Sequence, residues 1–255
     1  MLQKIKKHQF LFEELVKRDF KQKYKRTVLG MGWSVLSPLL TLLVMKLVFT
    51  QLFGRDTPHF TTYLFAGNIV MSFFRESTKG GMSSLMSNAK IFTKVNVPKY
   101  LFLLSKNVSV LVNFGLMLCV FFLFAFFDDI GFGLHMLSLA YPVLCLLIFN
   151  IGIGMILSAL FVFFRDTQYL YDVFLTLLTY LSAIFYTVDR FPAPAQRLFL
   201  LNPVYCYIRY FRLVVIDGII PSVQYHGLCF LYAAAALAAG IWVYKKNNHR
   251  FLYYV

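Results

Sequence analysis

Long apolar stretches joined by short polar links constrain the fold of this chain more than any other feature. A helix needs about 20 mostly apolar residues to cross the hydrocarbon core of a bilayer. No soluble fold of 255 residues could bury this much apolar surface, since 59% of the residues are hydrophobic and only 14% are charged. The sequence therefore predicts an all-α membrane protein with six transmembrane helices. They are expected at about 31–53, 61–82, 107–127, 134–164, 169–188 and 228–244.

The N-terminal segment, residues 1–30, differs from these stretches because it is basic and only periodically apolar. Phe12, Val16, Phe20 and Tyr24 recur at every fourth position, and lysines and arginines stand between them. This pattern predicts an amphipathic helix that lies in the headgroup layer on the cytoplasmic side. A disordered basic tail is the alternative interpretation.

Positive charges are concentrated on one side of the predicted topology. With both termini in the cytoplasm, the cytoplasmic segments hold eighteen lysines and arginines and the external segments hold five. The positive-inside rule favours that orientation. The net charge of +14 gathers at the ends of apolar stretches, so it does not indicate a nucleic-acid partner. Residues 1–255 are expected to form one transmembrane domain, with six spans in 31–244 and a cytoplasmic tail at 245–255.

Two stretches depart from a simple span. The run at 134–164 is too long for one upright crossing, and Pro142 is expected to separate an interfacial part from the span proper. The apolar stretch at 198–216 contains Arg209 and Arg212, each of which would cost about 2.5–3.5 kcal/mol at the bilayer centre. The segment between the fifth and sixth spans, 189–225, is therefore predicted to be external and to dip into the membrane edge.

The chain lacks the motifs that would give it chemistry of its own. It has no G-x-x-x-x-G-K-[ST] phosphate loop and no G-x-S-x-G motif, and its histidines and cysteines lack metal-ligand spacing. We expect no catalytic site, no metal site and no cofactor in this chain. Arg75 and Glu76 lie within the second stretch, where they either face a wet cavity or make ionic contacts between helices at a gate. An energy source on another polypeptide is expected, because chains of buried carboxylates are lacking.

Several motifs, in order along the whole chain, resemble those of one transporter family. They are Arg18-Asp19, the run Lys23-Tyr24-Lys25-Arg26-Thr27-Val28-Leu29-Gly30, Trp33 and Pro38, the run from Phe92 to Tyr100, Arg165-Asp166, Phe185-Tyr186, Asn202-Pro203 with Arg212, and Arg250-Phe251. The sequence looks like the permease subunit of an ABC transporter that exports polysaccharide, such as O-antigen, capsule or wall teichoic acid.

This resemblance implies an assembly and a substrate. Two copies of the permease would pair with two copies of a separate ABC ATPase, which binds ATP and Mg. The substrate would be a lipid-linked glycan moved outward across the bacterial cytoplasmic (inner) membrane. The N-terminal helix would lie along the membrane lipids, a coupling helix at 90–100 would dock on the ATPase, and short re-entrant helices would follow the fifth span. The implied coupling residues are Arg18, Asp19, Lys94, Pro98, Lys99 and Tyr100.

Aromatic and charged side chains are the candidates for a channel wall. Rings stack on sugar faces without sequence preference, which suits a polymer that must slide. The candidates are Trp33, Tyr63, Arg75, Glu76, Tyr186, Tyr205 and Tyr207. The tyrosines could equally belong to an interfacial aromatic belt. Two other functions stay open: a permease of a small-lipid or drug ABC exporter, and a non-transporting membrane scaffold.

Overall fold

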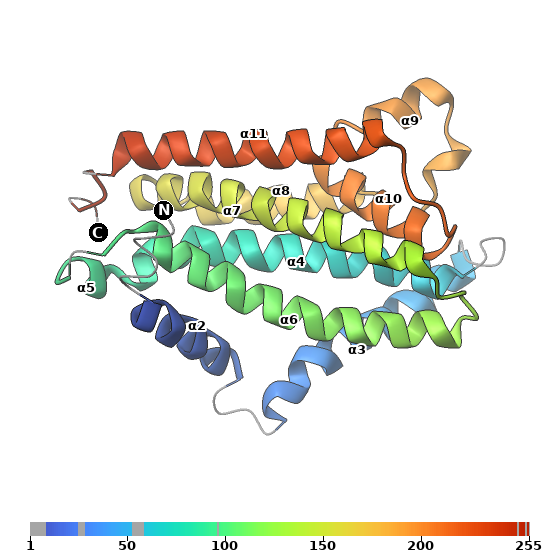
Figure 1. The fold of residues 1–255 in the computed structure, drawn as a ribbon, viewed down its shortest axis with the longest axis horizontal. Helices are drawn as coiled ribbons and strands as arrows, with labels where there is room; N and C mark the ends of the chain where they lie inside the picture. Colours follow the sequence, from blue (N-terminus) through green and yellow to red (C-terminus); the bar gives the residue numbers. More distant parts are fainter. Residues whose placement is uncertain are drawn as a thin grey trace.

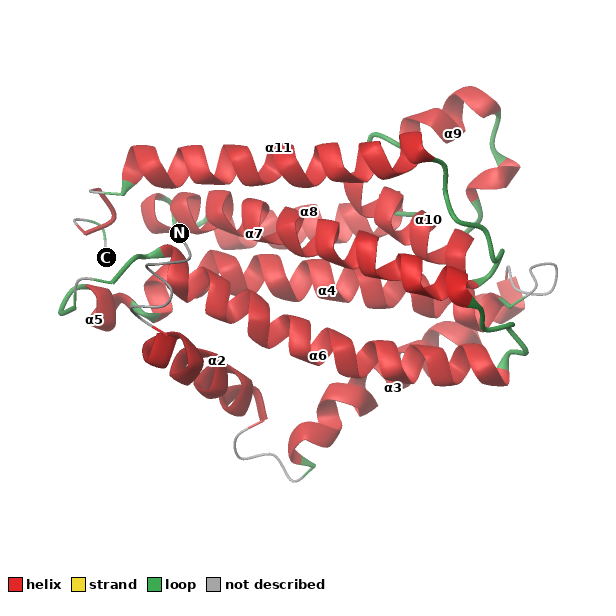
Figure 2. Ribbon diagram, viewed as in Figure 1, coloured by secondary structure: helices red, strands yellow, loops and turns green. Residues whose placement is uncertain are grey.

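A computed structural model describes residues 9–24, 29–52, 59–95, 97–248, 250–252 and 254. Within these ranges every regular element is a helix, as Figure 2 shows. The predicted all-α class is therefore confirmed for the described part of the chain. Half of the basic run Lys23 to Gly30 (25–28), and the polar residues 54–58 between the first two predicted spans, lie outside the described residues.

The longest helices run side by side along the length of the molecule (Figure 1). Helix α7 packs between α4 and α11, and α6 packs on the other side of α4. The elements are α2 (Gln9–Tyr24), η1 (Gly30–Gly32), α3 (Trp33–Leu52), α4 (Phe60–Ser87), α5 (Ala89–Phe92), α6 (Tyr100–Phe127), η2 (Leu134–Leu139), α7 (Ala140–Phe163), α8 (Thr167–Leu181), η3 (Val188–Arg190), α9 (Ala193–Phe199), α10 (Pro203–Val215), α11 (Val223–Asn247) and η4 (Arg250–Leu252).

Each of the six apolar stretches overlaps one α-helix, but the helices differ in whether their length and apolarity suffice to cross a bilayer. Within the described ranges, three segments are both long and apolar enough: Tyr100–Phe127, Leu134–Phe163 and Val223–Asn247. Helices α9 and α10 would add a fourth if the bent pair, which turns through 107°, counts as one span. These lengths and compositions establish a multi-pass helical membrane protein without fixing six crossings.

The polar link predicted between the second and third spans is shorter than expected. Helix α4 continues to Ser87, and α6 already begins at Tyr100 rather than at 107. Hydroxyl groups near the end of α4 find their partners within the helix. Ser83 Oγ donates to Gly80 O, and Ser84 Oγ donates to Gly81 O at 2.6 Å. The helix therefore continues past the apolar stretch with these polar side chains satisfied.

The fifth predicted span, 169–188, is wrong at its C-terminal end. Helix α8 stops at Leu181, so its 15 residues cover only about 22 Å. The chain reverses at Ala183, whose φ of 50° lies in the left-handed region. Asn202 fixes this turn by donating to Leu181 O and to Ser182 Oγ. A partner distant in sequence therefore ends the helix, which apolar patterning cannot anticipate.

The overlong fourth stretch divides as predicted into two parts, three residues earlier than expected. The 3-10 helix η2 ends at Leu139, and α7 begins at Ala140. Pro142 lies in the first turn of α7, where its missing N–H costs nothing because the first four N–H groups of a helix have no intrahelical partner. The division thus comes from the change of helix type, with proline as a tolerated first-turn residue.

The segment at 189–225 forms two helices that differ in burial, and its predicted external position stays a prediction. Helix α9 has no buried residue, whereas ten of the 13 residues of α10 are buried. Helix α10 packs on α4 and η2. Asn202 caps α10 by accepting from Val204 N and Tyr205 N, and Pro203 starts the helix. The 107° bend between α9 and α10 fits a re-entrant pair or a broken span.

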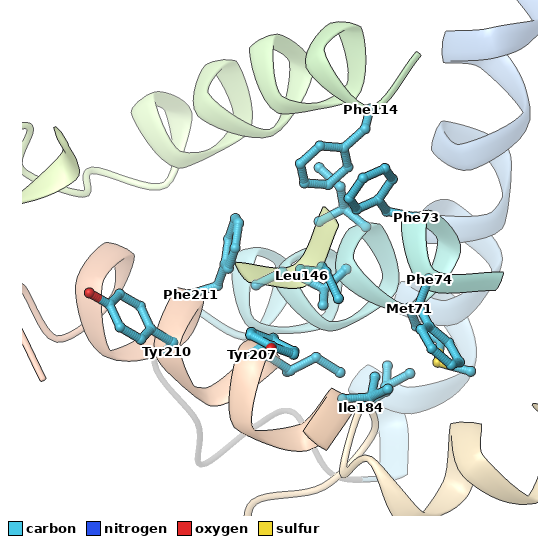
Figure 3. Close-up of a cluster of buried hydrophobic side chains, with 14 of the residues drawn as sticks. Met71, Phe73, Phe74, Phe114, Leu146, Ile184, Tyr207, Tyr210 and Phe211 are labelled. Atoms are coloured by element: carbon cyan, nitrogen blue, oxygen red, sulfur yellow. The ribbon is translucent and has the colours of Figure 1, made fainter. Parts of the chain in front are cut away.

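The main core fills the space between α4, α6, α7 and α10 with aromatic rings (Figure 3). Phe73 of α4 stacks on Phe114 of α6 with ring centroids 4.3 Å apart, and Phe74 stacks on Phe149 of α7. Tyr207 of α10 closes the row against Phe149 at 6.0 Å. These ring pairs join four helices into one bundle.

Glycines set the closest helix contacts. A Cβ added to Gly152 of α7 would lie 2.4 Å from the backbone carbon of Ala236 in α11, and one added to Gly240 would lie 2.6 Å from Gly152 O. Small residues let helices approach closely in membranes, where dispersion contacts replace the hydrophobic effect as the cause of association. The α7–α11 pair therefore depends on these two positions.

A second core cluster lies at the end of the bundle that carries α2 and α5, here called the α2 end. Leu15 of α2, Phe92 of α5, Val97, Tyr244 of α11 and Phe251 of η4 are all buried in it. The described N-terminal and C-terminal elements thus meet at the same end. The opposite end carries α9 and the start of α10 (Figure 1), and is called the α9 end.

Candidate functional site

The accessible face of α4 is polar, although the helix lies in the middle of an apolar bundle. Between 68 and 83, every residue of α4 that is not buried is polar or glycine. This set, the polar face of α4, comprises Asn68, Ser72, Arg75, Glu76, Lys79, Gly80 and Ser83. The spacing of three and four residues places them on one side of the helix.

Other helices present the opposite chemistry on their accessible faces. Large apolar side chains are exposed on α3, α6, α8 and α11, for example Leu43, Leu123, Val173 and Leu231. Such faces suit lipid. A polar helix face is expensive against hydrocarbon and is found in membranes where it meets water, a ligand or other polar groups. The polar face of α4 is therefore the candidate functional surface of this chain.

Two adjoining cavities border this face. The larger, about 460 Å³, lies between α2, α4 and α6 and is lined by Arg75, Lys79 and Lys106, among others. The smaller, about 30 Å³, lies between α3, α4 and α6 and is lined by Asn68 and Ser72, among others. Both share Glu76, Val110 and Asn113 as lining residues, so they adjoin one another along the polar face of α4.

Helix α8 is attached to α4 by a series of polar contacts, the α4–α8 seam. Tyr171 donates to Thr78 Oγ1 at 2.6 Å, and Arg75 donates to Thr179 Oγ1 at 3.0 Å. Lys79 Nζ lies 2.6 Å from Asp172 Oδ1. Only three residues of α8 are buried, so these contacts provide much of its attachment. Arg75 both contacts a neutral hydroxyl of α8 and lines the larger cavity, so its position decides between neither of the two hypotheses.

A second set of polar contacts attaches α2. Arg18 donates to Asp19 Oδ1 and, at 2.8 Å, to Asn88 Oδ1 beyond the end of α4. The other carboxylate oxygen of Asp19 lies 3.9 Å from Lys106 Nζ of α6. Asp19 is only 6% exposed, so it faces the bundle rather than a partner protein. Any part that Asp19 has in coupling must act through the attachment of α2.

The predicted coupling loop forms part of the surface at the α2 end. Lys94 and its neighbour Val95 are exposed, whereas Pro98, Lys99 and Tyr100 are half-buried. Lys99 donates to Asn248 O, and partial desolvation lowers the pKa of its ammonium group. Val95 was not among the sequence candidates, yet it is 53% exposed at the tip of the loop. A lone exposed valine in a basic loop gave no distinguishing signal.

The predicted channel tyrosines gather at the α9 end but point inward. Tyr63 donates to Tyr186 O at 2.7 Å, and Tyr207 donates to Cys229 O at 2.9 Å. Tyr205 and Tyr207 are 4% and 0% exposed, so within one chain they are core residues with paired or enclosed hydroxyls. Trp33 lies apart from these tyrosines, at the start of α3, and is 41% exposed. The tyrosines therefore lie near one another, but Trp33, Arg75 and Glu76 lie apart from them, so the seven candidates do not form one wall.

Arg212 organises the α9 end. Its guanidinium donates to Ala183 O at 2.8 Å, to Ile184 O at 3.1 Å and to Tyr63 O at 3.3 Å. It also stacks on the Tyr63 ring at 3.4 Å from the centroid. Gly67 makes room for it, because a Cβ there would lie 2.9 Å from Arg212 Nη2. Arg212, whose charge disfavoured a span at 198–216 in the sequence, is thus buried and links α4, α10 and the turn after α8.

The sequence could have revealed the polar face of α4 but not its partners. Polar residues recurring along α4 at helical spacing are a readable signal. Asp172, which holds Lys79, was missed because it stands alone among apolar residues of α8. In the sequence, Lys106 contributed only to the number of positive charges in the cytoplasmic segments. Among the described residues, no group of three or more His, Cys, Asp or Glu side chains is arranged to hold a metal ion.

The bundle and the polar face of α4 define a polytopic helical membrane protein with a hydrophilic surface along one helix. Residues 11–216 match the family model of the ABC-2 type transporters. The chain therefore belongs to the ABC-2 type transporter family, whose permeases work with a partner ATPase subunit. This confirms the resemblance to ABC permeases drawn from the motifs.

Curated relatives cover nearly the whole chain at modest identity. An O-antigen export system permease protein RfbA of Klebsiella pneumoniae is 26% identical over 247 residues, 95% of either chain. A protein of the same name from Myxococcus xanthus is 26% identical over 226 residues, covering 88% of this chain and 87% of the relative. The polysialic acid transport protein KpsM of Escherichia coli is 23% identical over 247 residues, 94% of either chain.

Proposed function

We propose that this chain is the membrane-spanning subunit of an ATP-driven exporter that moves a lipid-linked polysaccharide outward across the bacterial cytoplasmic membrane. The observation that carries the proposal is the polar face of α4. It provides a hydrophilic route in a bundle whose other accessible faces suit lipid. The relatives named for O-antigen export and polysialic acid transport support a glycan as the cargo.

In this proposal the chain supplies the route and a partner supplies the energy. Two copies pair with two ATPase subunits, which bind ATP and Mg, and the permease itself carries out no catalysis. The chain crosses the bilayer six times, with both termini in the cytoplasm, and the turn that follows the short helix α8 completes the fifth crossing. The α2 end then faces the ATPase, and the exposed loop tip at Lys94 and Val95 is the part of the coupling segment available for direct contact.

Blocking the polar face tests the route directly. Ser72 lines the smaller cavity, so Ser72→Leu should fill it and replace a hydrophilic wall with an apolar one. We expect surface glycan to fall about tenfold or more in cells, while the amount of protein in the membrane is unchanged, because added apolarity favours insertion. The measurement is immunoblotting of surface glycan beside membrane fractionation.

Val112→Leu provides the matched control, since it also enlarges a residue but on an apolar, exposed position of α6. It should export normally. Equal export by both variants would count against the route along α4. Normal glycan display in cells lacking the chain, together with altered efflux of small lipids or drugs, would favour the other exporter class. Loss of assembly at the membrane without any change in glycan would favour a scaffold.

A further inference from the structure

Charged side chains of both signs line the larger cavity. Three cations line it: Arg75 and Lys79 from α4, and Lys106 from α6. Two carboxylates, Asp19 and Glu76, share the lining. Its volume of about 460 Å³ is far more than a single water requires. A cavity of this size with three cations in its lining can admit a hydrated anionic group when that group displaces the carboxylates.

The lysines of this cavity are held by carboxylates from two flanking helices. Asp172 of α8 lies 2.6 Å from Lys79, and Asp19 of α2 lies 3.9 Å from Lys106. The stem of Lys106 passes over Gly80, where an added Cβ would lie 2.9 Å from Lys106 Cγ. A partly buried cation needs such a partner whenever no ligand is present. At 3.9 Å, the Lys106 ammonium group does not donate a close hydrogen bond to Asp19.

We propose that this cavity binds a phosphate-bearing group of the substrate, and that Asp19 and Asp172 neutralise its lysines until that group arrives. A guanidinium and two ammonium groups on separate turns match an oxyanion with several oxygens better than they match one carboxylate. The inference rests on the proposed function, because the phosphate is that of a lipid-linked glycan.

Binding then has a mechanical consequence. The incoming oxyanion competes with Asp172 for Lys79 and with Asp19 for Lys106. Lys79–Asp172 is one of the polar contacts that attach α8 to α4, and Asp19 belongs to the contacts that attach α2. Occupation of the cavity therefore loosens both flanking helices at once. Substrate arrival is in this way transmitted to α2, at the end of the bundle assigned to the ATPase.

Direct binding to the purified full-length chain tests the site without requiring transport. The protein is placed in phosphatidylcholine nanodiscs, and radiolabelled undecaprenyl diphosphate is the probe. Lys106→Gln should weaken binding about tenfold, the effect of losing one charge-assisted contact. For Lys79 the paired change Lys79→Gln with Asp172→Asn is used, so that the Asp172 carboxylate is not left without its partner, and the same loss is expected.

The carboxylate variants give a result of opposite sign. Asp172→Asn and Asp19→Asn remove the competitors but keep hydrogen-bonding side chains, so both should bind the probe about threefold or more tightly. A purely structural role for these residues predicts weaker or unchanged binding. Lys245→Gln, an exposed cation near the same end of α11, is the matched control and should bind like the parent chain.

Competing ligands separate the possible sources of phosphate. Inorganic diphosphate should compete with the probe, whereas nanodiscs containing phosphatidylglycerol should leave binding unchanged. Displacement by phosphatidylglycerol would assign the site to a membrane lipid and overturn the proposal. Lys106→Arg keeps the charge and should restore binding, which guards against misfolding as the cause of a loss. If the parent chain does not bind the probe while its cells export glycan normally, this site alone is rejected. If the parent chain binds the probe but does not support glycan export, the proposed function is rejected.

Discussion

A single buried cation, Arg212, holds three segments of the chain together at the α9 end. Burying an unpaired charge is costly, yet this guanidinium is surrounded by three carbonyl oxygens and the face of Tyr63. The same arrangement keeps Ala183 in its positive-φ conformation. One side chain thus pairs acceptors that the turn after α8 would otherwise leave unsatisfied.

Replacing Arg212 by lysine should show how much the planar guanidinium group contributes to the stability of the protein. Lysine keeps the charge but cannot reach three carbonyls at once, so we expect the protein to lose about 2–4 kcal/mol of stability. Thermal unfolding of the detergent-solubilised protein measures this loss. Arg209→Lys is the matched control, because Arg209 is half-buried and stacks on Tyr225 at 5.9 Å. Equal melting of the two variants would refute this role of Arg212.

At the scale of helices, the α7–α11 contact is the most sensitive to added volume. A Cβ on Gly152 would meet the backbone of α11 at 2.4–2.5 Å, and neither helix can yield through a flexible side chain. Gly152→Ala should therefore cost about 1–3 kcal/mol by overpacking. Gly115→Ala on α6 meets nothing within 4 Å and should be neutral or slightly stabilising. Unfolding in graded denaturing detergent compares the two, and equal resistance would show that the helices can separate without cost.

Helix existence was predictable, whereas helix ends were not. Every apolar stretch contains a helix, because apolar length and composition are local properties that chain sequence records directly. The end of α8 at Leu181 depends on a distant asparagine, and the start of α7 at Ala140 depends on a change of helix type. Those causes lie in hydrogen-bond partners, which hydropathy does not encode.

For the whole molecule, the proposed orientation makes opposite predictions for the two ends of the bundle. A cysteine at Arg197 on exposed α9 should react with an impermeant maleimide in intact cells. A cysteine at Lys94 should react only after the membrane is opened. The background needs Cys119 replaced, since it is exposed while the other three cysteines are buried. The reverse labelling pattern would overturn the topology.

The sequence alone determined the class of this protein: a basic, helical, multi-pass membrane chain whose motifs place it among ABC permeases. Composition and the order of motifs are properties of the sequence itself, so they can be read without a structure. Only the tertiary structure decided that α10 is a buried helix, that Tyr207 belongs to the core, and that Lys79 and Lys106 share a cavity with carboxylates of α8 and α2. These facts depend on which helix faces meet. Packing settles that by matching volumes and pairing polar groups between residues far apart in sequence.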